Sequence, residues 1–127
     1  MVNLLVAHHL FEAFPAASEG DLSRLRACIV SAEPLAEVAG ALRLGEALHL
    51  GSGELKSGGS RRQSILADAF EALCGALFLD AGLASTDAKV RALLAPRIAL
   101  LPPPEALKDP KTRLQEYLQS RSLALPL

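Results

Sequence analysis

The sequence predicts an all-α fold. Apolar residues recur at helical spacing in one segment after another, and capping residues, prolines or glycines separate these segments. No alternating strand pattern of useful length appears before Leu123. The chain has 127 residues, of which 50% are hydrophobic. It can therefore hold one modest domain with a real core, and an appendage.

The first predicted helix runs from Val2 to Phe14. It begins without a capping residue, so we expect it to start upstream of Met1. His8 and Glu12 are four residues apart, a spacing that suits metal ligands, but without a second such pair ordinary surface positions are favoured. The predicted apolar face consists of Leu4, Leu5, Val6, Leu10, Phe11 and Phe14.

The second predicted helix opens at Ser18, and Asp21 stands at the capping-box spacing from it. Glu19 fits a first-turn acid, which the helix dipole favours. Arg24 and Arg26 fall outside the apolar stripe, where a solvated face is favoured over phosphate contact. The stripe itself consists of Leu22, Leu25 and Ile29.

A short third helix follows Pro34, and then a loop-rich connection holds five glycines between Gly45 and Gly59. The connection superficially resembles a phosphate-binding loop. It lacks a glycine at the required spacing before Lys56, and no strand leads into it, so this interpretation is rejected. Three basic residues without an acid lie between Leu55 and Ala67. The third helix's stripe is Leu35, Val38, Ala39 and Leu42, and the basic residues are Lys56, Arg61 and Arg62.

The central predicted helix is apolar on nearly every side from Ile65 to Leu79, which is typical of a helix buried in the middle of a domain. Ser60 and Gln63 have capping-box spacing and mark its start. Gly82 is expected to stop it after Asp80.

Two acids, Asp68 and Glu71, interrupt this apolar helix. They are three residues apart and point the same way, and Gly75 leaves space beside Glu71. If they are buried, each carboxylate needs an ion pair, a hydrogen bond or a metal, and the two repel unless a cation lies between them. The residues alone leave open a structural ion pair and a metal site.

The C-terminal part begins with a predicted helix from Ser85 to Leu94. A proline run after Leu101 predicts a stiff linker and a domain boundary. Asp109 followed by proline opens the last helix, and the chain then continues in an apolar extended stretch to Leu127. The last helix has one apolar face, made of Leu114, Tyr117 and Leu118.

Overall charge and cysteine content place the chain in the cytoplasm. The net charge of −1 gives no general attraction to nucleic acid or membranes. Cys28 and Cys74 lie in apolar helical patterns and are interpreted as buried thiols rather than a disulfide. No apolar run reaches the length of a membrane span, and the start lacks the basic region of a signal peptide.

Three segments resemble bacterial ribonuclease III. They are EGDLSRLR at residues 19–26, LGSGELKSGG and RRQSILADAFEAL within residues 50–82, and DPKTRLQEYLQ at residues 109–119. The last segment is similar to the first helix of the family's double-stranded-RNA-binding domain. The resemblance covers essentially the whole chain and divides it into an all-α nuclease domain (1–101), a linker (102–108) and the start of the RNA-binding domain (109–127).

The resemblance implies a Mg²⁺-dependent endonuclease, with Mn²⁺ as a substitute, that cuts double-stranded RNA as a homodimer during rRNA and mRNA processing. Asp68 and Glu71 match family acids that bind the metal and act in catalysis, and Glu19 matches an accessory acid. The helix that contacts RNA would carry Thr112, Gln115 and Glu116.

One part of the family pattern has no counterpart here. Nothing matches the signature Asn-Glu followed by Glu-Phe-Leu-Gly-Asp, whose acids complete the metal site and whose helix lies at the dimer interface. Met1 resembles the residue that follows this signature, so we expect the chain alone to be weakly active or inactive. Two alternatives are a non-catalytic RNA-binding or dimerisation module and a helical interaction domain with a structural acid pair.

Overall fold

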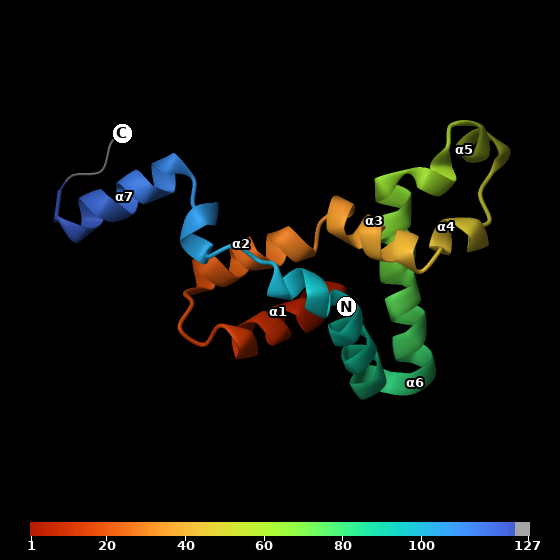
Figure 1. Cartoon of the computed structure of the whole chain (residues 1–127), viewed down its shortest axis with the longest axis horizontal. Helices are drawn as coiled ribbons and strands as arrows, with labels where there is room; N and C mark the ends of the chain where they lie inside the picture. The colour runs from red at the N-terminus through yellow and green to blue at the C-terminus, as the bar shows by residue number, and fades with distance from the viewer. Residues whose placement is uncertain (124–127) are drawn as a thin grey trace.

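The computed structural model describes residues 1–123, and this part of the chain is helical and contains no strand (Figure 1). The predicted all-α fold is therefore confirmed. The extended stretch expected at the end of the chain lies, beyond Leu123, outside the described residues. The helices are α1 (Val2–Ala13), α2 (Glu19–Ile29), α3 (Ala32–Ala41), α4 (Leu44–Ala47), α5 (Ser52–Lys56), α6 (Gln63–Ala99) and α7 (Pro110–Ser120), with the 3₁₀ turns η1 (Gly59–Arg61) and η2 (Pro104–Leu107).

The core lies where α1, α2 and α3 meet α6, and the most extensive helix contact is between α3 and α6. Phe70 of α6 is the largest side chain that is completely buried there. Because apolar burial is the main favourable term in folding, these contacts fix how α6 is placed. The core side chains are Val2, Leu5, Val6, Leu10, Leu25, Ile29, Leu35, Val38, Ala39, Ala67, Phe70, Cys74, Val90, Leu94 and Ile98.

Gly82 divides α6 into two arms, and Figure 1 shows the second arm turning back toward α1. Its backbone angles are φ 83° and ψ 176°, a combination that essentially only glycine adopts. The Thr86 hydroxyl donates a hydrogen bond to the Gly82 carbonyl over 2.9 Å. The helix break predicted at this glycine is confirmed, although the second arm runs to Ala99 rather than ending at Leu94.

One predicted cap is confirmed and the other is wrong. The Ser18 hydroxyl accepts a hydrogen bond from the Asp21 backbone at 3.1 Å, and the Asp21 carboxylate accepts one from the Ser18 backbone at 3.3 Å. Ser60 does not cap α6, because it lies inside the turn η1. Arg62 is the N-cap instead, and its side chain makes no capping hydrogen bond.

The expectation that the central helix is buried on every side is wrong. In the first arm of α6, Leu79 is 84% exposed, Leu73 45% and Phe78 38%. The side of this arm that carries Ala67 and Phe70 faces the core. The neighbouring helices cover only that side, so an apolar surface remains open on the described part of the chain.

The apolar face predicted for α1 is also too wide. Leu5, Val6 and Leu10 are buried, whereas Leu4 and Phe11 are 64% and 66% exposed. One side of α1 rests on α2 and α6 while the other faces solvent, which explains the difference.

The glycine-rich connection is more ordered than predicted, since it contains the short helices α4 and α5. A Cβ atom at Gly45 would lie 2.5 Å from the Ser60 carbonyl oxygen, so the close approach of these two segments requires glycine.

The two cysteines are free thiols, as predicted, with Cys74 buried and Cys28 half-buried. Among the described residues no helix is both long and apolar enough to cross a membrane.

Candidate functional site

Asp68 and Glu71 face the same pocket, of about 240 Å³, on the first arm of α6. This confirms the predicted common direction of the two acids. Residues from α1, α3 and the segment before α3 complete the walls. The pocket is lined by Asn3, Val30, Ser31, Ala32, Leu35, Ser64, Ala67, Asp68 and Glu71.

The prediction that these two acids are buried is wrong, because Asp68 and Glu71 are both exposed. The helix turns its buried side, with Ala67 and Phe70, toward the core, and the acids fall on the solvent side. Neither acid has an ion-pair or hydrogen-bond partner among residues 1–123, so a structural ion pair finds no support there. Both carboxylates are instead available to a ligand that enters from solvent.

Three neutral polar side chains share this pocket, from Asn3 of α1, Ser31 before α3 and Ser64 of α6. Ser31 is the N-cap of α3, yet its hydroxyl makes no capping hydrogen bond. Mg²⁺ prefers oxygen ligands, keeps several waters and is held by one or two carboxylates together with substrate phosphates. Two carboxylates among neutral oxygens fit that ion, although the described residues contain no cluster of three or more His, Cys, Asp or Glu side chains.

Glu19, the predicted accessory acid, is not brought to this pocket. It lies in the first turn of α2 and lines a different pocket, of about 270 Å³, together with Phe11 and Arg26. Within this chain, Glu19 therefore does not line the same cavity as Asp68 and Glu71.

The predicted RNA-binding residues Thr112, Gln115 and Glu116 lie on α7, at one end of the elongated molecule in Figure 1. The Asp109 carboxylate caps this helix and accepts hydrogen bonds from the Thr112 backbone and hydroxyl, each over 2.9 Å. These bonds lower the pKa of the Asp109 carboxyl. The predicted start of the last helix is confirmed.

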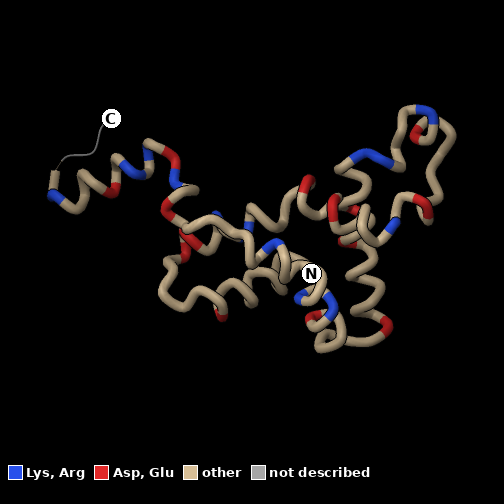
Figure 2. The backbone as a smooth tube through the Cα atoms, in the orientation of Figure 1, with Lys and Arg blue, Asp and Glu red and all other residues tan. Residues whose placement is uncertain are grey.

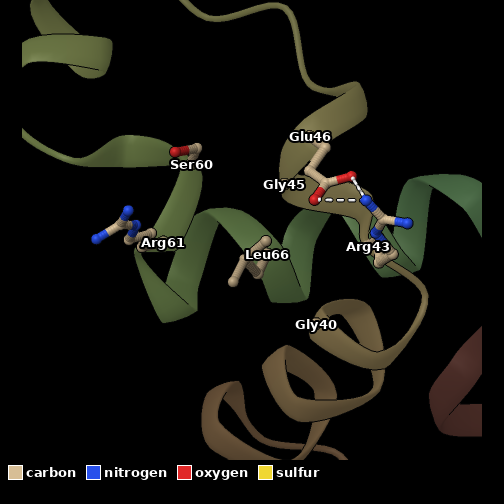
Figure 3. A pocket seen from close by; sticks show the side chains of 7 residues that line it. All are labelled: Gly40, Arg43, Gly45, Glu46, Ser60, Arg61 and Leu66. Atoms are coloured by element: carbon tan, nitrogen blue, oxygen red, sulfur yellow. Dashed lines mark hydrogen bonds and ion pairs between the residues drawn. The ribbon is translucent and has the colours of Figure 1, made fainter.

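A larger pocket of about 470 Å³ lies between α4, η1 and the start of α6 (Figure 3). Its one acid, Glu46, is already paired with Arg43 at 2.8 Å. Arg61 of the predicted basic segment also lines it, whereas Arg62 pairs with Glu54 at 3.3 Å. This pocket offers no unpaired carboxylate for a metal, despite its greater volume. The basic side chains of this corner are visible in Figure 2.

His8 and Glu12 take part in a structural cluster rather than a metal site. The Arg91 guanidinium donates to Glu12 over 2.7 Å and to Asp87 over 2.9 Å, and a further nitrogen lies 3.2 Å from the His8 ring. The hydrogen bond from Arg91 lowers the pKa of the Glu12 carboxyl. An arginine in contact with both predicted ligands disfavours a metal cation there.

The sequence match and the fold agree on one family. A model of the ribonuclease-III-like family matches residues 1–98. The chain belongs to the ribonuclease-III-like family. Asp68 and Glu71 lie inside the matched region, whereas α7 lies outside it.

Relatives in this family cover nearly all of the chain. Ribonuclease 3 of Thiobacillus denitrificans is 60% identical over 99% of this chain and 56% of its own length. Ribonuclease 3 of Pseudomonas fluorescens is 56% identical over 99% of this chain and 55% of its own length. The chain therefore spans about half the length of the curated relatives it matches.

A solved structure shares the ribonuclease-III-like fold. The nuclease domain of ribonuclease III from Campylobacter jejuni is 35% identical, with a TM-score of 0.74 over 78% of this chain and 69% of that one. That structure is described as showing flexibility in a region involved in dimer formation.

Sequence reasoning missed the neutral side chains of the acid pocket. Ser64 could have been found, because it precedes Asp68 by four residues and so lies on the same helix face. Asn3 and Ser31 come from other elements, and no local pattern links them to Asp68.

Replacing Asp68 by alanine is expected to leave the free energy of unfolding unchanged or to raise it by about 0.5 kcal/mol. The change removes a like charge beside Glu71 and introduces a better helix former. Thermal unfolding followed by circular dichroism measures the effect. Asp87→Ala is the matched control and should lower Tm, because Asp87 pairs with Arg91 at 2.9 Å. A marked fall in Tm for Asp68→Ala would show that Asp68 is structural.

Proposed function

We propose that this chain carries catalytic acids of an endonuclease that hydrolyses double-stranded RNA with Mg²⁺, leaves 5′-phosphate ends and acts in rRNA and mRNA processing. One observation carries the proposal: Asp68 and Glu71 face one open pocket without partners among the described residues. The ribonuclease-III-like fold adds support, because relatives named Ribonuclease 3 retain up to 60% identity to this chain.

Asp68 and Glu71 would hold the metal from one turn of α6, and Mn²⁺ could replace Mg²⁺ because both accept oxygen ligands. A bound Mg²⁺ would supply positive charge to the phosphodiester and lower the pKa of a water molecule. The neutral oxygens of Asn3, Ser31 and Ser64 would accept or donate hydrogen bonds to that hydration shell. The buried side of α6 beneath the acids holds them in place.

The proposed domain division is a nuclease domain at residues 1–101, a linker at 102–108 and the start of an RNA-binding domain at 109–127. Thr112, Gln115 and Glu116 would contact the RNA minor groove from α7. Recognition of duplex RNA by shape needs a surface that spans more than one groove. The chain alone is therefore expected to bind RNA weakly and to cleave slowly, in the cytoplasm.

A homodimer is proposed as the active form. The exposed apolar surface of α6 supports pairing, since Leu73, Phe78 and Leu79 are open to solvent. Glu19, which lines a separate pocket, could then act beside the acids of a second copy rather than those of its own chain.

A non-catalytic RNA-binding or dimerisation module is the second candidate. It is favoured by the presence of only two acids in the pocket, with no cluster of three or more possible ligands in the described residues. In that role the acids would be remnants, and the exposed surface of α6 would be the functional part.

The test incubates the chain with long duplex RNA, with single-stranded RNA of the same sequence and with either Mg²⁺ or a chelator. We expect slow, Mg²⁺-dependent cleavage of the duplex alone, with products that carry 5′ phosphates. Intact duplex together with measurable binding would favour the non-catalytic module. If the chain neither cleaves nor binds duplex RNA, a helical interaction domain remains.

A further inference from the structure

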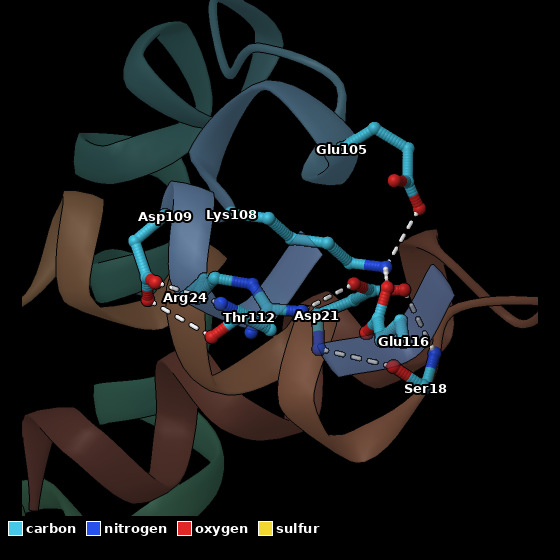
Figure 4. A network of polar contacts seen from close by, with 8 residues as sticks. All are labelled: Ser18, Asp21, Arg24, Glu105, Lys108, Asp109, Thr112 and Glu116. Atoms are coloured by element: carbon cyan, nitrogen blue, oxygen red, sulfur yellow. Dashed lines mark hydrogen bonds and ion pairs between the residues drawn. The ribbon is translucent and has the colours of Figure 1, made fainter. Parts of the chain in front are cut away.

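Lys108 lies at the end of the linker and is almost enclosed by acids. Its side chain is only 10% exposed, and its Nζ donates to Glu116 over 2.8 Å and lies 3.0 Å from the Glu105 carboxylate (Figure 4). These hydrogen bonds, first from Glu116 and then from Glu105, raise the pKa of the Lys108 ammonium. The side chain therefore stays charged at neutral pH.

The same lysine lies close to the nuclease helices. The turn η2, which precedes it, contacts α2 along the chain's first antiparallel pair of helices. The pKa of Asp21 in α2 is lowered, mainly by the hydrogen bond from Arg24, and the charge of Lys108 acts in the same direction. Figure 4 shows Lys108 between the start of α2, η2 and α7.

Helix α7 has little else to hold it. None of its residues is buried, and it does not belong to the hydrophobic core. Among the described residues, it makes no close backbone approach to another helix. Its Asp109–Thr112 cap is local and fixes the helix itself rather than its direction. The contact between Glu116 and Lys108 is therefore the tertiary bond that sets how α7 is oriented.

We infer that Lys108 is a positioning residue that fixes helix α7 relative to the nuclease helices by joining Glu116 to Glu105 beside the start of α2. The orientation itself needs neither RNA nor metal. Its consequence for RNA, namely that the direction of α7 sets how a duplex approaches Asp68 and Glu71, rests on the proposed function. Lys108 acts through Glu116 and is not assigned a contact with RNA.

The bond is compact enough to be specific. An ammonium shared by two carboxylates at 2.8 and 3.0 Å is a charge-assisted contact, and its low exposure limits competition from water. Glutamine at position 108 would remove the charge but keep most of the side-chain volume. Arginine would keep the charge and the ability to donate to both acids.

The test measures residual dipolar couplings of backbone N–H bonds in the whole chain, without RNA or metal. In the native chain a single alignment tensor should describe α7 together with α2, α3 and α6. In Lys108→Gln the α7 couplings should fall by about twofold or more relative to those of the nuclease helices, because α7 moves independently. Lys108→Arg should restore the native values.

Two further variants make the result specific. Glu116→Gln should also release α7, because it removes the α7 end of the bond and leaves Glu105 in place. Lys111→Gln is the matched control, since Lys111 is an exposed lysine of the same helix and its loss should change nothing. Unchanged chemical shifts in α1 to α6 show that each variant is folded.

The proposal is overturned if Lys108→Gln keeps a single tensor, or if the native chain already needs two. Because no RNA enters the measurement, its outcome is independent of whether the chain cleaves or binds RNA. A chain without nuclease activity can still show the orientation, and an active chain can lack it.

Discussion

Glu71→Gln is expected to reduce Mg²⁺-dependent cleavage of duplex RNA by about a hundredfold or more, equivalent to roughly 2.7 kcal/mol of transition-state stabilisation. The change keeps the shape of the side chain but removes one of the two negative charges in the pocket. A divalent cation held by two carboxylates loses much of its attraction when one becomes neutral. Folding should be unaffected, because Glu71 is exposed and has no partner among the described residues.

Two measurements check this prediction. Single-turnover cleavage with excess protein gives the rate, and Mn²⁺ binding followed by electron paramagnetic resonance gives the metal affinity even if cleavage by the native chain is slow. Asp80→Asn is the matched control, since Asp80 is an exposed acid on the same helix but outside the pocket. Equal loss in both variants, or normal Mn²⁺ affinity in Glu71→Gln, would remove Glu71 from the proposed metal site.

Phe70→Ala is expected to lower the free energy of unfolding by about 3–5 kcal/mol. Phe70 is completely buried in the first arm of α6, where α3 packs against it. Truncation removes apolar contacts and leaves a cavity that rigid helices fill only in part. Since small domains are stable by only about 5–15 kcal/mol, this single change is expected to remove a large share of the total.

Urea unfolding followed by circular dichroism measures this loss, with the transition midpoint and its slope recorded together. Leu79→Ala is the control on the same helix, because Leu79 is 84% exposed, and it should change stability by less than about 0.5 kcal/mol. A loss for Leu79→Ala as large as that for Phe70→Ala would mean that the outer surface of α6 is covered in solution. Pairing with a second copy would have that effect.

Local signals in the sequence were sufficient for the fold class and for several element boundaries. The reciprocal cap between Ser18 and Asp21 is confirmed, as are the N-cap at Asp109 and the helix break at Gly82. Each depends on residues at most a few positions apart, so the pattern contains all the information required. The failed cap at Ser60 shows the limit of this reasoning. The spacing was right, but a 3₁₀ turn occupies that segment.

The candidate site could be predicted only in part. The direction shared by Asp68 and Glu71 follows from helical geometry and is confirmed. Their burial was predicted from the apolar residues around them, and it is wrong because those residues are themselves partly exposed. Composition shows how apolar a helix is, but it does not show how many neighbours cover it.

The sequence by itself determined an all-helical chain, the break at Gly82 and a pair of acids on one side of α6. Only the tertiary structure decided that Phe70 faces α3 while the acids face solvent, that Asn3 and Ser31 join them, and that Lys108 ties α7 to the linker. The physical reason is that helical periodicity acts over a few residues. Which face of a helix is covered, by contrast, depends on segments that are distant in the chain and meet only when the core packs.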